Sequence, residues 1–206
     1  MDIYFLRHAN AGEAKFSSTK DAKRPIDKLG IEQSHDVGRA LAALDTAVDV
    51  ILSSPLRRAT QTAAVVANEI GYEDKVIADA ALLPGASFQQ FRELLVRHSR
   101  KEAIMVVGHN PSMTEFLNRI LFAEGRHNAV EMKKGSVARV EKVGRRTAVL
   151  KWCMPPKAVR LIQQASASSS RPKTVSKYFF SCCTAHSSSS IPSGGCGLRR
   201  KRTRPS

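Results

Sequence analysis

The sequence has no long apolar run, few cysteines and few aromatic residues. No apolar stretch approaches the ~20 residues that span a bilayer, and the first one, residues 3–6, ends at a charged residue. We therefore expect neither a signal peptide nor membrane insertion, and we expect the protein to be cytoplasmic. Four cysteines without a C-x-x-C pair are too few for a disulfide scaffold. Aromatic residues make up 6% of the chain, which argues against a stacking surface for single-stranded nucleic acid.

Acidic residues are absent from the last fifth of the chain. Residues 165–206 hold eight Lys or Arg and no Asp or Glu, so more than half of the net charge of +15 lies there. The preceding residues 1–164 carry 25 basic and 18 acidic groups. This mild excess suits an anionic substrate as well as a polyanion.

The same boundary separates two kinds of sequence. Periodic apolar patterns run to about Gln164, whereas the rest is rich in serine and glycine and ends in a basic cluster at 199–202. Such a composition buries too little apolar area to offset the entropy of ordering. We expect one domain over residues 1–164 and a disordered, Ser-rich basic tail over residues 165–206.

Apolar runs alternate with helical patterns along the domain, which predicts an α/β sandwich with a largely parallel sheet. Strands are expected at residues 2–6, 49–53, 75–78, 103–107, 137–141 and 147–152. Helical stripes lie at residues 37–44, 59–70, 88–95 and 113–121. Ser54 and Asn110 are predicted to cap the helices that follow them, with Pro55 and Pro111 as first helical residues, and the helix at 88–95 is expected to begin after Ser87.

Basic side chains follow three of the predicted strands. Arg7 and His8 end the first strand, Arg58 follows the second, and His109 follows the strand at 103–107. If these strands are parallel neighbours, two arginines and two histidines meet at one edge of the sheet beside helix N-termini. Guanidinium groups and backbone N–H groups bind phosphate, and an imidazole there can attack phosphorus.

These segments resemble the signature blocks of the histidine phosphatase (phosphoglycerate mutase-like) superfamily. The blocks are residues 6–9 (LRHA), 53–63 (SSPLRRATQTA) and 107–111 (VGHNP). Residues 24–30 (RPIDKLG), 134–138 (KGSVA) and 152–156 (WCMPP) are similar to its SixA-type phosphohistidine phosphatase branch. The resemblance covers about residues 1–160 and implies a three-layer α/β/α fold without a metal or organic cofactor.

The resemblance also implies residue roles. His8 would be the nucleophile, Arg7 and Arg58 would hold the phosphoryl oxygens, and His109 would bind the same group and stabilise charge during transfer. Arg57 would be the spare arginine of its pair. Arg24 would contact substrate at the rim of the site.

A carboxylate is missing where larger superfamily members carry an acid for the leaving group. Residues 80–87 (AALLPGAS) contain none, and only Asp79 and Glu93 flank them. A departing imidazole needs such an acid less than an alkoxide does, because its conjugate acid has a far lower pKa. The sequence therefore favours a histidine-phosphorylated protein as substrate.

Two other functions stay open. One is a small-molecule phosphomonoesterase of the same fold. The other is a non-catalytic protein that binds phosphate or nucleic acid through the basic tail; otherwise no nucleic-acid partner is expected.

Overall fold

The computed structural model describes residues 1–13, 18–122, 129–142 and 147–169. Its elements follow in the order β1 (Asp2–Arg7), α1 (Ser18–Ala22), α2 (Lys28–Ala43), β2 (Val50–Ser53), α3 (Arg57–Glu69), β3 (Ile77–Ala78), the 3-10 turn η1 (Ala80–Leu82), α4 (Phe88–Arg97), β4 (Ala103–Gly108), α5 (Ser112–Leu121), β5 (Val137–Lys142), β6 (Ala148–Met154) and α6 (Pro156–Ser169). Within these residues no helix is both long and apolar enough to cross a membrane.

The strands form one mixed sheet in the order β3-β2-β4-β1-β5-β6. The first four run parallel, while β5 is antiparallel to both β1 and β6. Arg7 pairs with Gly108, and Ser53 pairs with Val107. The carboxyl ends of β1, β4 and β2 therefore stand level at one edge of the sheet, as the sequence predicted.

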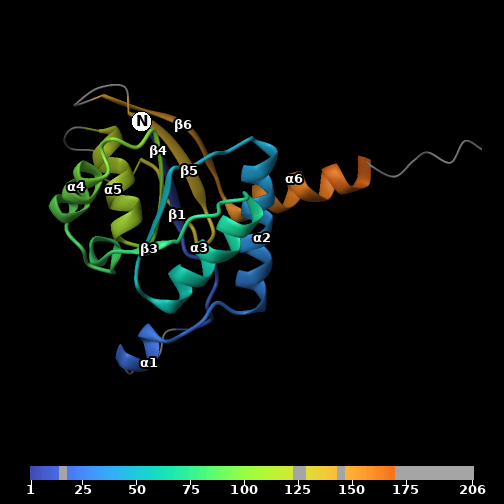
Figure 1. The fold of residues 1–206 in the computed structure, drawn as a ribbon. Helices are drawn as coiled ribbons and strands as arrows, with labels where there is room; N and C mark the ends of the chain where they lie inside the picture. Colours follow the sequence, from blue (N-terminus) through green and yellow to red (C-terminus); the bar gives the residue numbers. More distant parts are fainter. Residues whose placement is uncertain (14–17, 123–128, 143–146, 170–206) are drawn as a thin grey trace, which may run out of the picture. The chain divides into compact units, whose positions relative to one another are not determined.

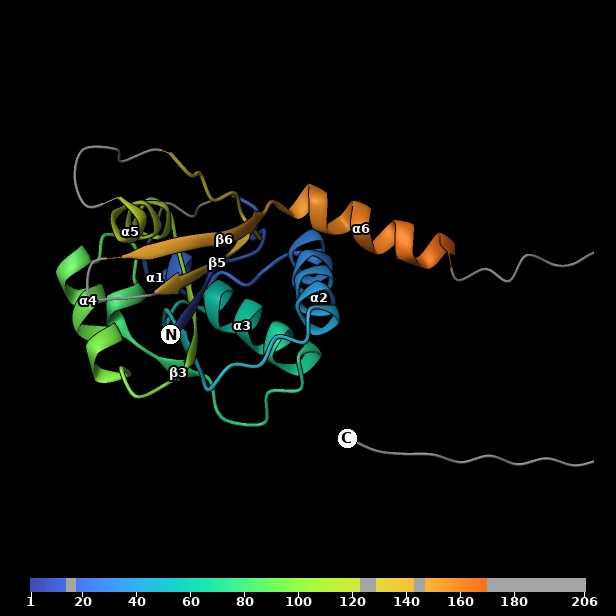
Figure 2. The ribbon, with the colours of Figure 1, turned by 90° about the horizontal axis from the view of Figure 1, so that it is seen from above.

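Helices cover both faces of the sheet, which confirms the three-layer α/β/α fold (Figures 1 and 2). Helices α4 and α5 lie on one side, and α2, α3 and α6 on the other. Alternate residues of each central strand join opposite cores: Phe5 packs in the core under α4 and α5, and Leu6 in the core under α2 and α3. A parallel sheet buried on both faces explains why its strands read as continuous apolar runs.

Both predicted helix caps are wrong. Helix α3 begins at Arg57, and α5 begins at Ser112, and neither has a side-chain cap. Ser54 and Asn110 instead hydrogen-bond across the domain, to His109 and to the carbonyl of Met132. A side-chain cap does occur at the start of α4, where Ser87 forms a capping box with Gln90.

Other departures concern the ends of the elements. Residues 75–76 lie outside the short strand β3, and Leu44 follows the end of α2 with 53% of its surface exposed. Helices α1 and α6 and the turn η1 were not predicted. Helix α6 runs through the boundary expected at residue 164, and residues 170–206 of the predicted tail lie outside the described residues.

Candidate active site

The histidines and arginines singled out in the sequence meet at the carboxyl end of the parallel strands. Because β4 lies between β1 and β2, His8 and His109 become neighbours, with ring centroids 4.8 Å apart and ring planes inclined at 51°. Arg7 ends β1, and Arg58 lies in the first turn of α3. Residues separated by about a hundred positions thus form one cluster.

His8 is buried and held in one orientation. Its Nδ1 lies 2.7 Å from the carbonyl oxygen of Ala9, to which it donates a proton, so Nε2 is the nitrogen that keeps a lone pair. The backbone N–H of Ala9 donates to Thr62 Oγ1, whose hydroxyl donates to the carbonyl of Arg58. Burial, aided by Arg58 and Arg7, lowers the pKa of His8 from 6.5 to about 4, although the Ala9 bond opposes this shift. His8 is therefore a neutral imidazole at physiological pH.

Arg7 and Arg58 both hold buried donors that the described residues leave without a partner. Arg7 Nη1 donates to the carbonyl of Met132 at 2.8 Å, but the Nε of each arginine has no hydrogen-bond partner there. Burial lowers the pKa of both guanidinium groups, against the opposing effects of Glu131 on Arg7 and of Asp21 on Arg58. Buried, unpaired guanidinium donors are costly unless an anion reaches them. Arg57 is exposed, as expected of the spare arginine.

His109, like the two arginines, has a buried nitrogen without a hydrogen-bond partner in the described residues. Its Nε2 lies 2.9 Å from Ser54 Oγ, while its buried Nδ1 has no partner in the described residues. Burial, together with the charges of His8, Arg58 and Arg7, lowers the pKa of His109 to about 2. His109 is therefore a neutral imidazole at physiological pH, and a nearby anion would favour its protonated form.

Arg24 lies at this end of the domain but bonds to the chain itself. Its Nε contacts the Asp21 carboxylate at 2.8 Å, and its Nη1 donates to the carbonyls of Ala11 and Gly12. These bonds tie α1 to the loop that follows His8. A contact between Arg24 and substrate stays a prediction.

Asp21 is the site residue that the sequence did not reveal. One of its carboxylate oxygens lies 3.2 Å from Arg58 Nη1, and its carbonyl accepts from the same nitrogen at 3.1 Å. Helix α1 has only five residues and no apolar stripe, so no periodicity marks it. The one feature of the sequence that points to Asp21 is its spacing of three residues from Arg24.

Gly30, within the segment at residues 24–30, allows a close approach between α2 and the loop after His8. Asp27 caps α2 by accepting from Gly30 N at 2.8 Å, and its other oxygen accepts from Asn10 Nδ2 at 2.6 Å. A Cβ atom on Gly30 would overlap the carbonyl oxygen of Asn10. Glycine thus allows α2 to sit directly against the loop after His8.

The acids that flank residues 80–87 are engaged elsewhere. Asp79 accepts from Ala81 N and from Arg97 Nη2, and Glu93 accepts from Gln89 on the exposed side of α4. Neither carboxylate contacts the two histidines. Among the described residues no group of three or more His, Cys, Asp or Glu could hold a metal ion.

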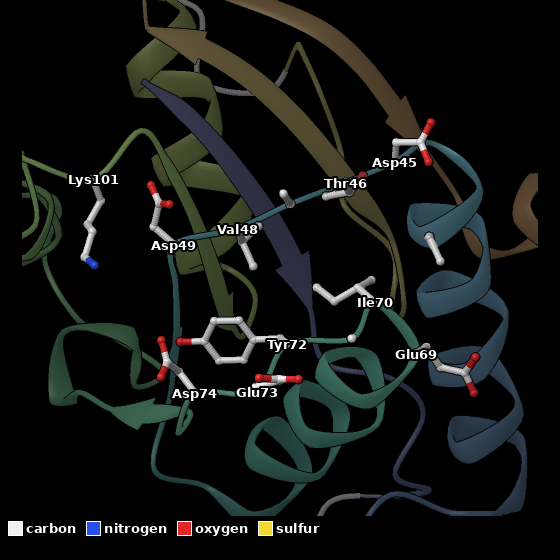
Figure 3. Close-up of a pocket in the computed structure, with 13 residues that line it drawn as sticks. Asp45, Thr46, Val48, Asp49, Glu69, Ile70, Tyr72, Glu73, Asp74 and Lys101 are labelled. Carbon is white, nitrogen blue, oxygen red and sulfur yellow. The ribbon is translucent and has the colours of Figure 1, made fainter.

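A cavity of about 930 Å³ lies away from these residues, at the opposite end of β2 (Figure 3). Five carboxylates and one lysine line it: Asp45, Asp49, Glu69, Glu73, Asp74 and Lys101. This charge repels a phosphoryl group. The histidine cluster, rather than this acidic cavity, is the candidate active site.

Comparisons with known proteins bear on the family and the fold of this chain. Residues 3–83 match the family model of the histidine phosphatase superfamily (branch 1). An uncharacterized protein of Picosynechococcus sp. is 31% identical over 140 residues, which cover 66% of this chain and 82% of that protein.

Solved structures share the fold at lower identity. The protein histidine phosphatase SixA complexed with tungstate matches with a TM-score of 0.66 and 19% identity, covering 76% of this chain and 98% of that one. The alpha-ribazole phosphatase from Shigella flexneri matches with a TM-score of 0.58 and 15% identity, covering 73% and 95%. Proteins named for different substrates therefore share this fold.

Proposed function

The chain belongs to the histidine phosphatase superfamily, and from this membership we propose that it hydrolyses phosphohistidine on a protein through a covalent phosphohistidine intermediate at His8, without a metal or organic cofactor. The observation that carries the proposal is the buried pair of His8 and His109, flanked by arginine donors that lack partners in the described chain. That arrangement can bind a phosphoryl group and supply a nucleophile to it.

His8 is suited to attack phosphorus. Its pKa of about 4 leaves Nε2 unprotonated at neutral pH, and the bond from Nδ1 to Ala9 orients the ring. In the proposed first step Nε2 forms a bond to phosphorus while the bond from phosphorus to the substrate nitrogen breaks. The electron pair of that broken bond stays on the leaving nitrogen.

The arginines and His109 are suited to the transferred group. Arg7 and Arg58 place two guanidinium groups beside His8, and the Nδ1 of His109 is unpartnered there. Positive and hydrogen-bonding groups held in place before reaction stabilise the charge of the transition state. In this proposal they bind the equatorial oxygens as the phosphoryl group passes to His8.

The leaving group favours a P–N bond over a P–O bond. Asp79 and Glu93 are engaged with other residues, so neither is placed to protonate an alkoxide. The conjugate acid of imidazole has a pKa near 6.5, against roughly 16 for water-like alcohols. An imidazole can therefore leave without the acid that an ester requires.

Hydrolysis of the phosphohistidine intermediate also depends on the His8 ring. The Nδ1 proton that His8 donates to Ala9 makes the phosphorylated ring a cation, so His8 departs as a neutral imidazole when water attacks phosphorus. The second step thus mirrors the first. The fold shared with SixA, named as a protein histidine phosphatase, supports a protein substrate.

A small-molecule phosphomonoesterase is the second candidate. One observation favours it: the fold is also shared with an alpha-ribazole phosphatase. A binding protein that works through its basic tail remains a third hypothesis, and the end of that tail lies outside the described residues.

Phosphate release by wild type and His8→Ala tests these functions side by side. The substrates are a histidine-phosphorylated protein and a panel of phosphate monoesters, each assayed with a chelator present. Release from the phosphohistidine protein that disappears in His8→Ala supports the proposal. Turnover of esters alone moves the function to small molecules, and no release from any substrate rejects catalysis.

A further inference from the structure

Asp21 is joined to the site through two cations. Its carboxylate lies 3.2 Å from Arg58 Nη1 and 2.8 Å from Arg24 Nε. It also acts electrostatically on His109, whose positive form it favours. Helix α1, which carries Asp21, lies beyond the carboxyl ends of the parallel strands (Figure 1).

The Asp21 side chain is more exposed than the arginine that it contacts. The Arg58 side chain is 6% exposed, whereas that of Asp21 is 23% exposed. A substrate that brings a phosphoryl group to Arg58 therefore passes its leaving group near a negative charge. The negative charge of Asp21 attracts a leaving group that is positively charged and does not attract one that is uncharged.

We propose that Asp21 is a specificity-determining residue, which selects a phosphoryl group carried by a protonated imidazole ring over one carried by an uncharged alcohol. The inference rests on the proposed function and names the protonation state of its substrate. A monoester presents only negative charge to Asp21. A phosphohistidine whose second ring nitrogen is protonated presents a cation that the carboxylate attracts.

The chemistry of transfer requires the same protonation state. The nitrogen bound to phosphorus receives the electron pair of the breaking P–N bond, while the second nitrogen keeps its proton. The ring then leaves as neutral imidazole, and no proton has to be delivered during the step. Asp21 acts here as a counter-ion to the ring, in addition to its ion pairs with Arg24 and Arg58.

Loss of this charge has two effects of opposite sign. Without its counter-ion, the protonated ring binds less well in the transition state. Without the carboxylate, Arg58 loses an internal competitor, so a simple oxyanion binds more tightly. A residue that merely supported the fold would weaken both.

Asp21→Asn tests the inference, with Asp36→Asn as its matched control. Asp36 also contacts two arginines, at 3.3 Å from Arg39 and 3.5 Å from Arg160, and its side chain is 17% exposed. It lies on α2 and takes no part in the proposed site. Both variants are assayed for hydrolysis of phosphohistidine and of p-nitrophenyl phosphate, and for tungstate binding by calorimetry.

In Asp21→Asn we expect kcat/KM for phosphohistidine to fall by about 10- to 100-fold, the size of one charge-assisted interaction. Tungstate binding and any ester hydrolysis should strengthen, and Asp36→Asn should match wild type in every assay. A parallel fall of all three quantities in Asp21→Asn, or no change, overturns the role of Asp21 while the proposed function stands. A wild type that hydrolyses esters but not phosphohistidine overturns the proposed function, and the inference with it.

Discussion

Polar groups at the two ends of the parallel strands differ in whether they have hydrogen-bond partners. At the carboxyl end, Arg7, Arg58 and His109 each hold a buried nitrogen without a hydrogen-bond partner in the described chain. At the amino end, Asp49 lines the acidic cavity, yet its carboxylate accepts from the backbone N–H groups of Glu102 and Ala103.

This difference distinguishes a ligand-binding site at the carboxyl end from a structural contact at the amino end. Bonded groups such as Asp49 connect β2 to β4, and their contribution is to the stability of the fold. Unpaired buried donors reduce stability, and they persist where a ligand satisfies them. Substitutions at the two ends should therefore change different measurements.

The largest effect is expected for Arg58→Ala. Removal of one preorganised donor from a phosphoryl site should lower kcat/KM by roughly 10²- to 10³-fold. Arg57→Ala is the neighbouring control: its side chain is exposed, so turnover should stay within about twofold of wild type. Steady-state kinetics on the phosphohistidine protein compares the two, and equal losses would show that the wrong arginine has been assigned.

Two glycines of α2 allow a sharper test. A Cβ atom at Gly30 would overlap the Asn10 carbonyl, and one at Gly38 would overlap the Glu69 side chain. Overpacking should cost about 1–3 kcal/mol of unfolding free energy in either Gly→Ala variant. Only Gly30→Ala displaces the loop after His8, so only it should lose activity, by about 10-fold or more.

Urea unfolding and kinetics, measured on the same samples, separate these effects. If Gly38→Ala lost as much activity as Gly30→Ala, the loss would follow stability rather than the position of the loop.

His8 should titrate far below an ordinary histidine. Burial and two nearby arginines lower its pKa from 6.5 to about 4, so the ring should stay neutral as pH falls until it approaches that value. Nitrogen chemical shifts of the His8 ring, followed by NMR with acidity, measure this directly. Titration at or above 6.5 would contradict the burial and charge that we assign to the site.

The smallest effect is expected at the opposite end. Hydrogen bonds from Ala103 and Glu102 lower the pKa of Asp49 below 3.8. The stabilisation is fully present above the unfolded pKa and disappears as pH falls through the folded value. Asp49→Asn should lower the free energy of unfolding by about 1 kcal/mol at pH 7, less near pH 3, and leave turnover unchanged. Reduced turnover would show that the two ends are coupled.

Much of the fold could be predicted because its signals are local. Continuous apolar runs marked the buried strands, and the level ends of β1, β2 and β4 then followed from the rule for parallel sheets. The positions of His8 and His109 required no more than that rule.

The errors arise where a side chain bonds to a residue that is distant in the sequence. Ser54 and Asn110 look like helix caps in the sequence, but their partners, His109 and Met132, lie far along the chain. Asp21 was missed for a related reason, because its short helix is held by Arg24 and Arg58 rather than by an apolar face. Such pairings depend on the finished fold, and local patterns do not contain them.

The central claim is that the phosphoryl group passes from a substrate nitrogen to His8. Its most direct test is to mix the protein with phosphohistidine that carries radioactive phosphorus, quench in alkali within milliseconds, and locate the label by peptide mapping. The account predicts acid-labile, alkali-stable label on the peptide that contains His8, and none in His8→Ala. Rapid phosphate release from wild type with no label on that peptide would contradict it.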